Sequence, residues 1–139
     1  MVQGQVLIAS DLASSGKWTG SLENMLAQRE VGVRRTWTGP SAVDFIRRGG
    51  IDMAVLGFDS PGDGLATLRL IRAVNQLLPC MVVAREVSSL LLRQALMLGV
   101  SSVLTEPIDV RFMTALIGRL LPMMANRPTV VGPQGNLEV

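Results

Sequence analysis

The sequence predicts an α/β domain whose doubly wound sheet has five parallel strands, covered by helices on both faces. Three observations lead to this class. Short apolar segments alternate five times with amphipathic ones, they lack the apolar–polar alternation of half-exposed strands, and 139 residues suffice for one well-packed domain. Because parallel strands need right-handed crossovers, a helix is expected after each strand.

Five segments are expected to form the strands, and their composition indicates where each lies. They are 5–10, 31–37, 52–58, 80–84 and 101–106. QVLIAS, DMAVLGF and CMVVA are almost uninterrupted apolar runs, which is typical of strands buried on both faces. VGVRRTW alternates only weakly and suits an outer strand.

The segments between the strands have apolar residues at helical spacing and are expected to be helices. Their ranges are 20–30, 40–50, 63–78, 88–99 and 110–121. Ser21 is expected to cap the first helix, and Pro40 to begin the second. Gly99 is expected to end the fourth helix, and Asp109 to cap the fifth.

The chain is expected to divide into one domain, residues 1–125, and a linker or tail, residues 126–139. The second part is rich in proline and glycine, which suits a connection to a further domain. In a doubly wound sheet, ligands bind beyond the carboxyl ends of the strands. Candidate functional residues are therefore sought at those ends.

Composition narrows the classes of function. The net charge is +2, histidine is absent, and the single cysteine, Cys80, lies in an apolar run. These counts exclude a disulfide and a cysteine–histidine zinc site, and a buried thiol indicates a reducing, cytoplasmic compartment. Neither a membrane span nor a signal peptide is expected, and scattered arginines with few aromatic residues argue against nucleic-acid binding. No cofactor, metal site or enzymatic activity is expected.

Four segments, in order and at suitable intervals, carry a family resemblance. They are VLIASD, IDMAVLGFDSPGDGL, LPCMVVA and ALMLGVSSVLTEPID. Together they resemble four strand regions of the receiver domain of two-component response regulators, from about residue 5 to about residue 121. The last segment is the most specific. The resemblance implies a flavodoxin-like (βα)5 fold with strand order 2-1-3-4-5.

The resemblance places Gly57 at the phosphoacceptor position, where the family has an aspartate. Glycine has no side chain to phosphorylate. Ser10 and Asp11 correspond to the acid pair that holds Mg²⁺, so one of two carboxylates remains. Asp59 lies two residues beyond Gly57. It could replace the lost acceptor only if the strand continued that far, and otherwise it shapes the turn.

Three further positions depart from the family's pattern. Ala84 corresponds to the switch hydroxyl and cannot bond a phosphoryl oxygen. Val103 corresponds to the switch aromatic residue. Glu106 corresponds to the lysine, and its negative charge would repel a phosphoryl group. A further hypothesis is an ion pair between Arg85, which follows Ala84 at a strand end, and Glu106. Such a pair would lock the pocket.

We therefore expect a phosphorylation-independent pseudo-receiver that acts as a protein-interaction or dimerisation module in a bacterial signalling or assembly protein. In the family, such domains pair through the fourth helix, fifth strand and fifth helix, and precede output or ATPase domains. The expected core positions of the two helices are Leu92, Ala95, Leu96, Phe112, Leu116, Ile117 and Leu120. The expected interaction surface consists of Leu90, Leu91, Met97, Val103 and Met113.

Two alternatives stay open. Four arginines form two adjacent pairs, Arg34 with Arg35 and Arg47 with Arg48. They are either solvated ends of elements or an anion-binding corner, which would make the domain a sensor of a nucleotide or another small ligand. A working phospho-receiver would instead need Asp59 as its acceptor.

Overall fold

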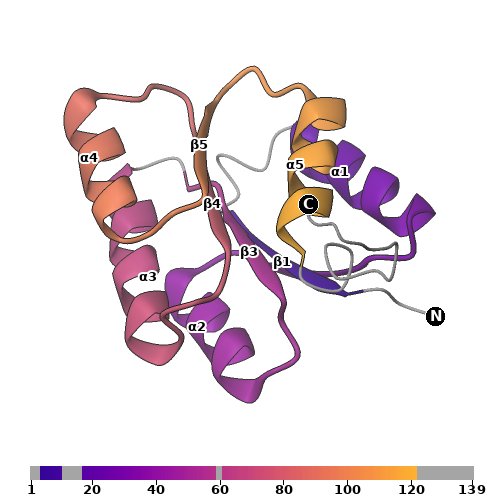
Figure 1. The fold of residues 1–139 in the computed structure, drawn as a ribbon, viewed down its shortest axis with the longest axis horizontal. Helices are drawn as coiled ribbons and strands as arrows, with labels where there is room; N and C mark the ends of the chain where they lie inside the picture. The colour runs from indigo at the N-terminus through magenta and orange to yellow at the C-terminus, as the bar shows by residue number, and fades with distance from the viewer. Residues whose placement is uncertain (1–3, 11–16, 59–60, 122–139) are drawn as a thin grey trace, which may run out of the picture.

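The computed structural model describes residues 4–10, 17–58 and 61–121. In this part of the chain, five parallel strands form one sheet in the order β2-β1-β3-β4-β5, with five helices around it (Figure 1). The predicted class and strand order are both confirmed. The predicted linker, 126–139, lies outside the described residues. None of the described helices is long and apolar enough to cross a membrane.

The strands are those that the apolar runs predicted, with small differences at their ends. They are β1 (Gln5–Ala9), β2 (Gly32–Thr36), β3 (Met53–Leu56), β4 (Cys80–Ala84) and β5 (Ser102–Thr105). The three central strands are buried along almost their whole length, whereas β2 and β5, at the edges, are only partly buried. The continuous apolar runs thus lie where helices cover both faces.

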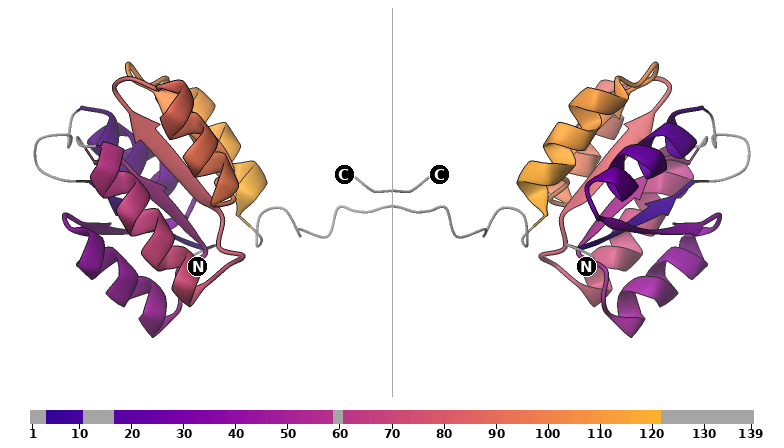
Figure 2. Two further views of the ribbon diagram at one scale, coloured as in Figure 1. Left: turned by 90° about the vertical axis from the view of Figure 1, so that its left-hand side faces the viewer. Right: turned by 90° about the vertical axis from the view of Figure 1, so that its right-hand side faces the viewer.

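The helices divide between the two faces of the sheet. They are α1 (Lys17–Gln28), α2 (Gly39–Arg48), α3 (Pro61–Val74), α4 (Ser89–Met97) and α5 (Val110–Leu120). Figures 1 and 2 show α1 beside α5 on one face, and α2, α3 and α4 side by side on the other. The result is a three-layer sandwich.

Helix starts followed one prediction and contradicted another. Asp109 caps α5, because its Oδ1 accepts hydrogen bonds from the amides of Arg111 (3.0 Å) and Phe112 (3.2 Å). Ser21 does not cap α1 but lies inside it, since the helix begins four residues earlier. The buried residue Trp18 sits one helical turn before the buried Leu22, which extends the apolar stripe of α1 toward its start.

The core consists of two apolar layers that alternate along the same strands. Leu7 and Leu56 face the α2–α3–α4 layer, whereas Ile8 and Val55, their neighbours in sequence, face the α1–α5 layer. This alternation is the two-residue period of a strand. A single residue's shift in register would exchange the two layers, so packing fixes the register strongly.

The α4 face that meets the sheet differs from the prediction. Leu91 and Ala95 are buried, whereas Leu92 and Leu96, which were expected in the core, are exposed. Successive helical residues point about 100° apart, so an inner stripe shifted by one position exchanges buried and exposed leucines. Two runs of three apolar residues, 90–92 and 95–97, allow either stripe to face the sheet, so the sequence did not determine which one does.

The same kind of correction applies to α5. Met113 is fully buried and Phe112 is 54% exposed, the reverse of the expectation, while the buried Ile117 confirms one predicted core position. Met113, Ile117 and Leu121 are four residues apart and form the inner stripe against α1. Leu91 and Met113 are therefore removed from the predicted interaction surface.

The guanidinium group of Arg72 joins α3 to α4 and to the chain before β4. Nε donates to the carbonyl oxygen of Leu98 (2.6 Å), Nη2 to that of Gly99 (3.1 Å), and Nη1 to those of Leu78 (2.8 Å) and Asn75 (3.1 Å). These carbonyls lie beyond the C-terminal ends of two helices, where main-chain acceptors lack helical partners. One arginine therefore satisfies four of them.

Cys80 lies beside this arginine at the start of β4 and is fully buried. Burial raises the pKa of the Cys80 thiol from 9.0 to about 11, and the nearby Arg72 guanidinium opposes part of that rise. The thiol is therefore neutral across the physiological range, which suits a packing role rather than a reactive one.

The substitution Arg72→Ala is expected to lower the free energy of unfolding by about 2–4 kcal/mol, because it leaves several carbonyls without a charged donor. Arg72→Lys should recover less than half of this loss, since one ammonium group cannot reach all four acceptors. Urea unfolding measures both. Arg69→Ala, on the exposed side of α3, is the matched control and should stay within about 0.5 kcal/mol. Equal losses for the two alanine variants would contradict the role of Arg72.

Alkaline pH is expected to destabilise the protein through Cys80. The folded-state pKa is raised, so this stabilisation is complete below about pH 9 and is lost as pH rises toward 11. At about pH 10.5 the loss should reach about 2 kcal/mol, from the energy equivalent of each pKa unit. Urea unfolding of the native protein and Cys80→Ala at several pH values tests this. A chain without tyrosine and with a single lysine has little other titration there, and equal slopes for the two proteins would contradict the prediction.

Candidate functional site

Four of the predicted pocket residues meet at the carboxyl edge of the sheet. Ser10, Gly57, Ala84 and Glu106 end or directly follow the strands β1, β3, β4 and β5. The amide of Gly57 donates to the carbonyl of Ala9 (2.8 Å), and the amide of Glu106 to that of Ala84 (2.9 Å). The other two predicted residues, Asp11 and Asp59, lie outside the described residues.

The space beside Gly57 is filled by the indole ring of Trp18. A Cβ atom built on Gly57 would lie 2.7 Å from Trp18 Cζ2, 3.1 Å from Cη2 and 3.8 Å from the Cβ of Ser10. The first distance is shorter than carbon atoms tolerate, so any larger side chain at this position requires the ring to move. Trp18 comes from the first turn of α1 and is almost fully buried.

The burial of Trp18 includes its polar atom. Nε1 has no hydrogen-bond partner among the described residues. A buried indole N–H without an acceptor costs free energy, so the apolar contacts of the ring with its cluster must outweigh this cost. Sequence reasoning missed Trp18. The available signal was a glycine at a strand end together with a tryptophan at the start of a helix.

Glu106 does not pair with Arg85. Among the described residues the single ion pair joins Arg35 Nη1 and Glu23 Oε1, 3.3 Å apart, so the proposed lock is not formed. Arg85 is exposed and Glu106 is partly exposed.

The described residues at this edge do not supply the groups that a magnesium ion and a phosphoryl group need. Gly57 and Ala84 supply no side-chain oxygen, and Glu106 brings a negative charge where a phosphoryl group needs a positive one. Mg²⁺ prefers several oxygen ligands in octahedral geometry. Among the described residues, no three His, Cys, Asp or Glu side chains lie close enough together to hold a metal ion.

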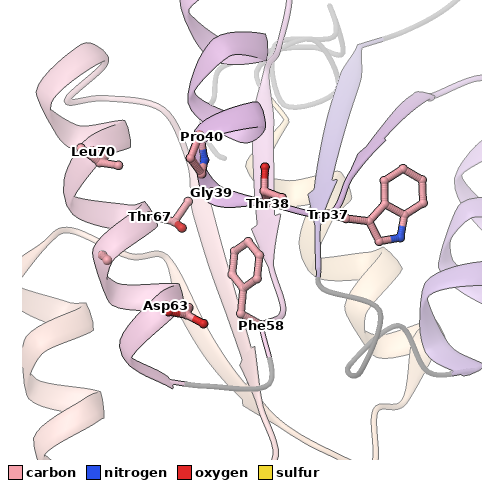
Figure 3. A pocket seen from close by; sticks show the side chains of 9 residues that line it. Trp37, Thr38, Gly39, Pro40, Phe58, Asp63, Thr67 and Leu70 are labelled. Atoms are coloured by element: carbon pink, nitrogen blue, oxygen red, sulfur yellow. The ribbon is translucent and has the colours of Figure 1, made fainter.

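A cavity of about 320 Å³ borders this edge between α2 and α3. Figure 3 shows the ring of Phe58, which follows Gly57, pointing toward Thr38, with Asp63 and Thr67 along α3. The ring of Trp37 is turned away from the other labelled side chains. The cavity wall is mostly apolar, with few polar groups to orient a ligand.

The four predicted anion-binding arginines do not form one cluster. Arg34 and Arg48 line a second cavity, at the opposite end of the strands. Arg35 instead pairs with Glu23 and lies 5.6 Å from the centre of the Trp37 ring. Arg47 is exposed and is not part of the cavity wall.

Comparison with known proteins identifies the fold. No protein-family model and no curated protein matches the sequence. A CheY-like response regulator receiver domain protein from Methanospirillum hungatei JF-1 superposes with a TM-score of 0.76 at 16% identity, covering 88% of this chain and 96% of that one. The non-phosphorylated HemR receiver domain from Leptospira biflexa gives 0.73 at 18%, covering 94% and 98%.

A third solved structure is the receiver domain of a sensor histidine kinase from Pseudomonas aeruginosa PAO1, with a magnesium ion coordinated in its active site cleft. Its TM-score is 0.70 at 20% identity, covering 85% of this chain and 97% of that one. The protein described here therefore has the receiver fold of response regulators.

Gly57→Ala is expected to lower the free energy of unfolding by about 1–3 kcal/mol, because the added methyl group collides with Trp18. In a Trp18→Leu background the same change should cost at least about 1 kcal/mol less, giving a measurable coupling energy. Urea unfolding of the parent protein, the two single variants and the double variant gives this coupling energy in a double-mutant cycle.

Gly20→Ala is the matched control for this cycle. It lies in α1 with no atom within 4 Å of a built Cβ, so the change should be neutral or stabilise the helix by up to about 1 kcal/mol. If Gly57→Ala costs the same in both backgrounds, the ring is not the barrier.

Proposed function

We propose that this domain is a phosphorylation-independent pseudo-receiver that acts as a protein-interaction or dimerisation module in a cytoplasmic signalling or assembly protein. The observation that carries the proposal is the contact between Gly57 and Trp18. The position that would accept a phosphoryl group has no side chain, and an indole ring occupies the adjoining space.

Electrostatics at the same edge supports this proposal. Glu106 directly follows β5, where the resemblance puts a lysine, and Ala84 ends β4 in place of a hydroxyl. A phosphoryl group would therefore meet a carboxylate and a methyl group in place of a cation and a hydrogen-bond donor. Both changes oppose the charge and hydrogen bonds that such a group needs.

The apolar surface of α4 supports a role in binding. Exposed apolar side chains here are Leu90, Leu92, Leu96 and Met97, and Phe112 is exposed on α5. These two helices flank the edge strand β5 on opposite faces (Figure 1). Val103 of β5 is half-buried against the core, so its contribution to this surface is small. Exposed leucine and methionine side chains suit a protein partner.

The proposed occupant of this surface is a second copy of the chain. A monomer with several exposed leucine and methionine side chains on one short helix lowers its free energy by burying them against an equivalent helix. In this proposal, an output or ATPase domain follows the receiver fold in each copy. Pairing through α4 then brings the two output or ATPase domains close to each other.

Two measurements with and without Mg²⁺ and beryllofluoride test whether the pocket at the carboxyl edge binds a mimic of the phosphoryl group. They are sedimentation velocity across protein concentrations and thermal unfolding. The sedimentation coefficient and the thermal unfolding temperature should not respond to beryllofluoride, because the pocket lacks an acceptor side chain at Gly57. A shift in either would contradict the proposal and direct attention to Asp59 as a substitute acceptor.

Met97→Glu is expected to weaken self-association at least about tenfold, since a charge at the interface must be desolvated. Leu77→Glu is the matched control. Leu77 is the most exposed of the large apolar residues that the structure describes, at 90%, and it lies beyond α3. Its substitution should leave the association constant unchanged. Equal effects of the two changes, or a monomer at every concentration, would contradict dimerisation through α4.

A further inference from the structure

A cavity lies at the amino edge of the sheet, opposite the Gly57 edge. It is formed where β1 and β2 begin and where α2 ends, and its volume is about 340 Å³. Its wall includes Gln5, Arg34, Phe45, Arg48 and the turn of Gly49 and Gly50. The volume lies within the range of roughly 300–1,000 Å³ typical of small-molecule sites.

Local geometry selects one arginine from each basic pair. Arg34 and Arg35 are consecutive strand residues, so their side chains leave opposite faces of β2. Arg47 and Arg48 are consecutive helical residues and point about 100° apart. Arg34 and Arg48 line the cavity together, although they come from different elements of the chain, whereas Arg35 and Arg47 do not line it.

Neither of these two cations is neutralised within the described part of the chain. Arg34 Nε donates to Gln5 Oε1 at 3.3 Å, and Arg48 lies 5.7 Å from the centre of the Phe45 ring. The described ion pair elsewhere involves Arg35. Asp44 and Asp52 each lie four residues from Arg48 in sequence, and Glu30 lies four from Arg34, but no ion pair joins any of these described residues to either arginine. The carboxylate of Asp52 instead accepts the amide of Gln5 at 2.8 Å. Two positive charges thus face one hollow.

The remaining wall of the cavity suits a flat, partly apolar group. Phe45 and Ile51 are partly buried and pack on the core beneath it. Gly49 and Gly50 both have φ of 89°, a conformation that favours glycine, and no atom lies within 4 Å of a Cβ built on either. Without side chains there, a ligand can approach the backbone of the turn closely.

We propose that this cavity binds a nucleoside monophosphate, with its phosphate on Arg34 and Arg48 and its base against Phe45. A guanidinium group gives planar, charge-assisted hydrogen bonds to phosphate oxygens, and it stacks on aromatic rings. This site is separate from the proposed pairing through α4. Its loss would therefore leave self-association unchanged.

The proposal is tested by titrating the ¹⁵N-labelled 139-residue chain with adenosine monophosphate, guanosine monophosphate, adenosine and inorganic phosphate, followed by NMR. A monophosphate nucleotide should shift the amides of Gln5, Gly49, Gly50 and Ile51, and bind at least about tenfold more tightly than adenosine or phosphate. The absence of saturable binding by either nucleotide overturns the proposal. Equal affinity for phosphate overturns the role assigned to Phe45.

Variants give the matched comparison. Arg34→Gln and Arg48→Gln should each weaken nucleotide binding at least about tenfold, through loss of a charge-assisted contact. Arg47→Gln removes the same charge from the same turn of α2 without altering the cavity wall, and should weaken binding less than about threefold. These positions are exposed, so unfolding curves should match the parent protein. Equal weakening by Arg47→Gln and Arg48→Gln overturns the proposed site in favour of general charge attraction.

Discussion

The central constraint on this protein is that β1, β3 and β4 are buried on both faces. Their side chains alternate between two apolar layers, so neither face of the sheet can be left to solvent. Helices must therefore cover both sides, and each helix must turn one apolar stripe inward. The parallel arrangement then gathers every strand's carboxyl end at one edge and every amino end at the other, which defines the two places where function is sought.

At the carboxyl edge, close packing fills the space beside Gly57. A glycine at the end of β3 and a tryptophan at the start of α1 form one contact, in which the missing side chain makes room for the ring. An aspartate at position 57 would need both a displaced ring and a cation nearby, yet Glu106 provides the opposite charge. These features are the basis of the proposed pseudo-receiver, because both oppose a phosphorylated side chain at this position.

The amino edge and α4 retain features that packing alone leaves unused. Arg34 and Arg48 face a hollow with an aromatic wall, and α4 exposes several leucine and methionine side chains. The first suits a small anion and the second a protein surface, because charge and apolar area favour different partners. The two regions lie on different elements, so ligand binding and pairing are physically separable in this fold.

The class, the order of elements and the five positions that differ from the receiver pattern were readable from the sequence alone, because these depend on local period and local residue type. It could not decide which stripe of α4 or α5 faces inward, since apolar residues such as Leu92 and Phe112 offered more than one face. It also could not place Trp18 beside Gly57, nor join Arg34 to Arg48. Those contacts link distant parts of the chain, and only the packing of helices on the sheet sets the distances between them.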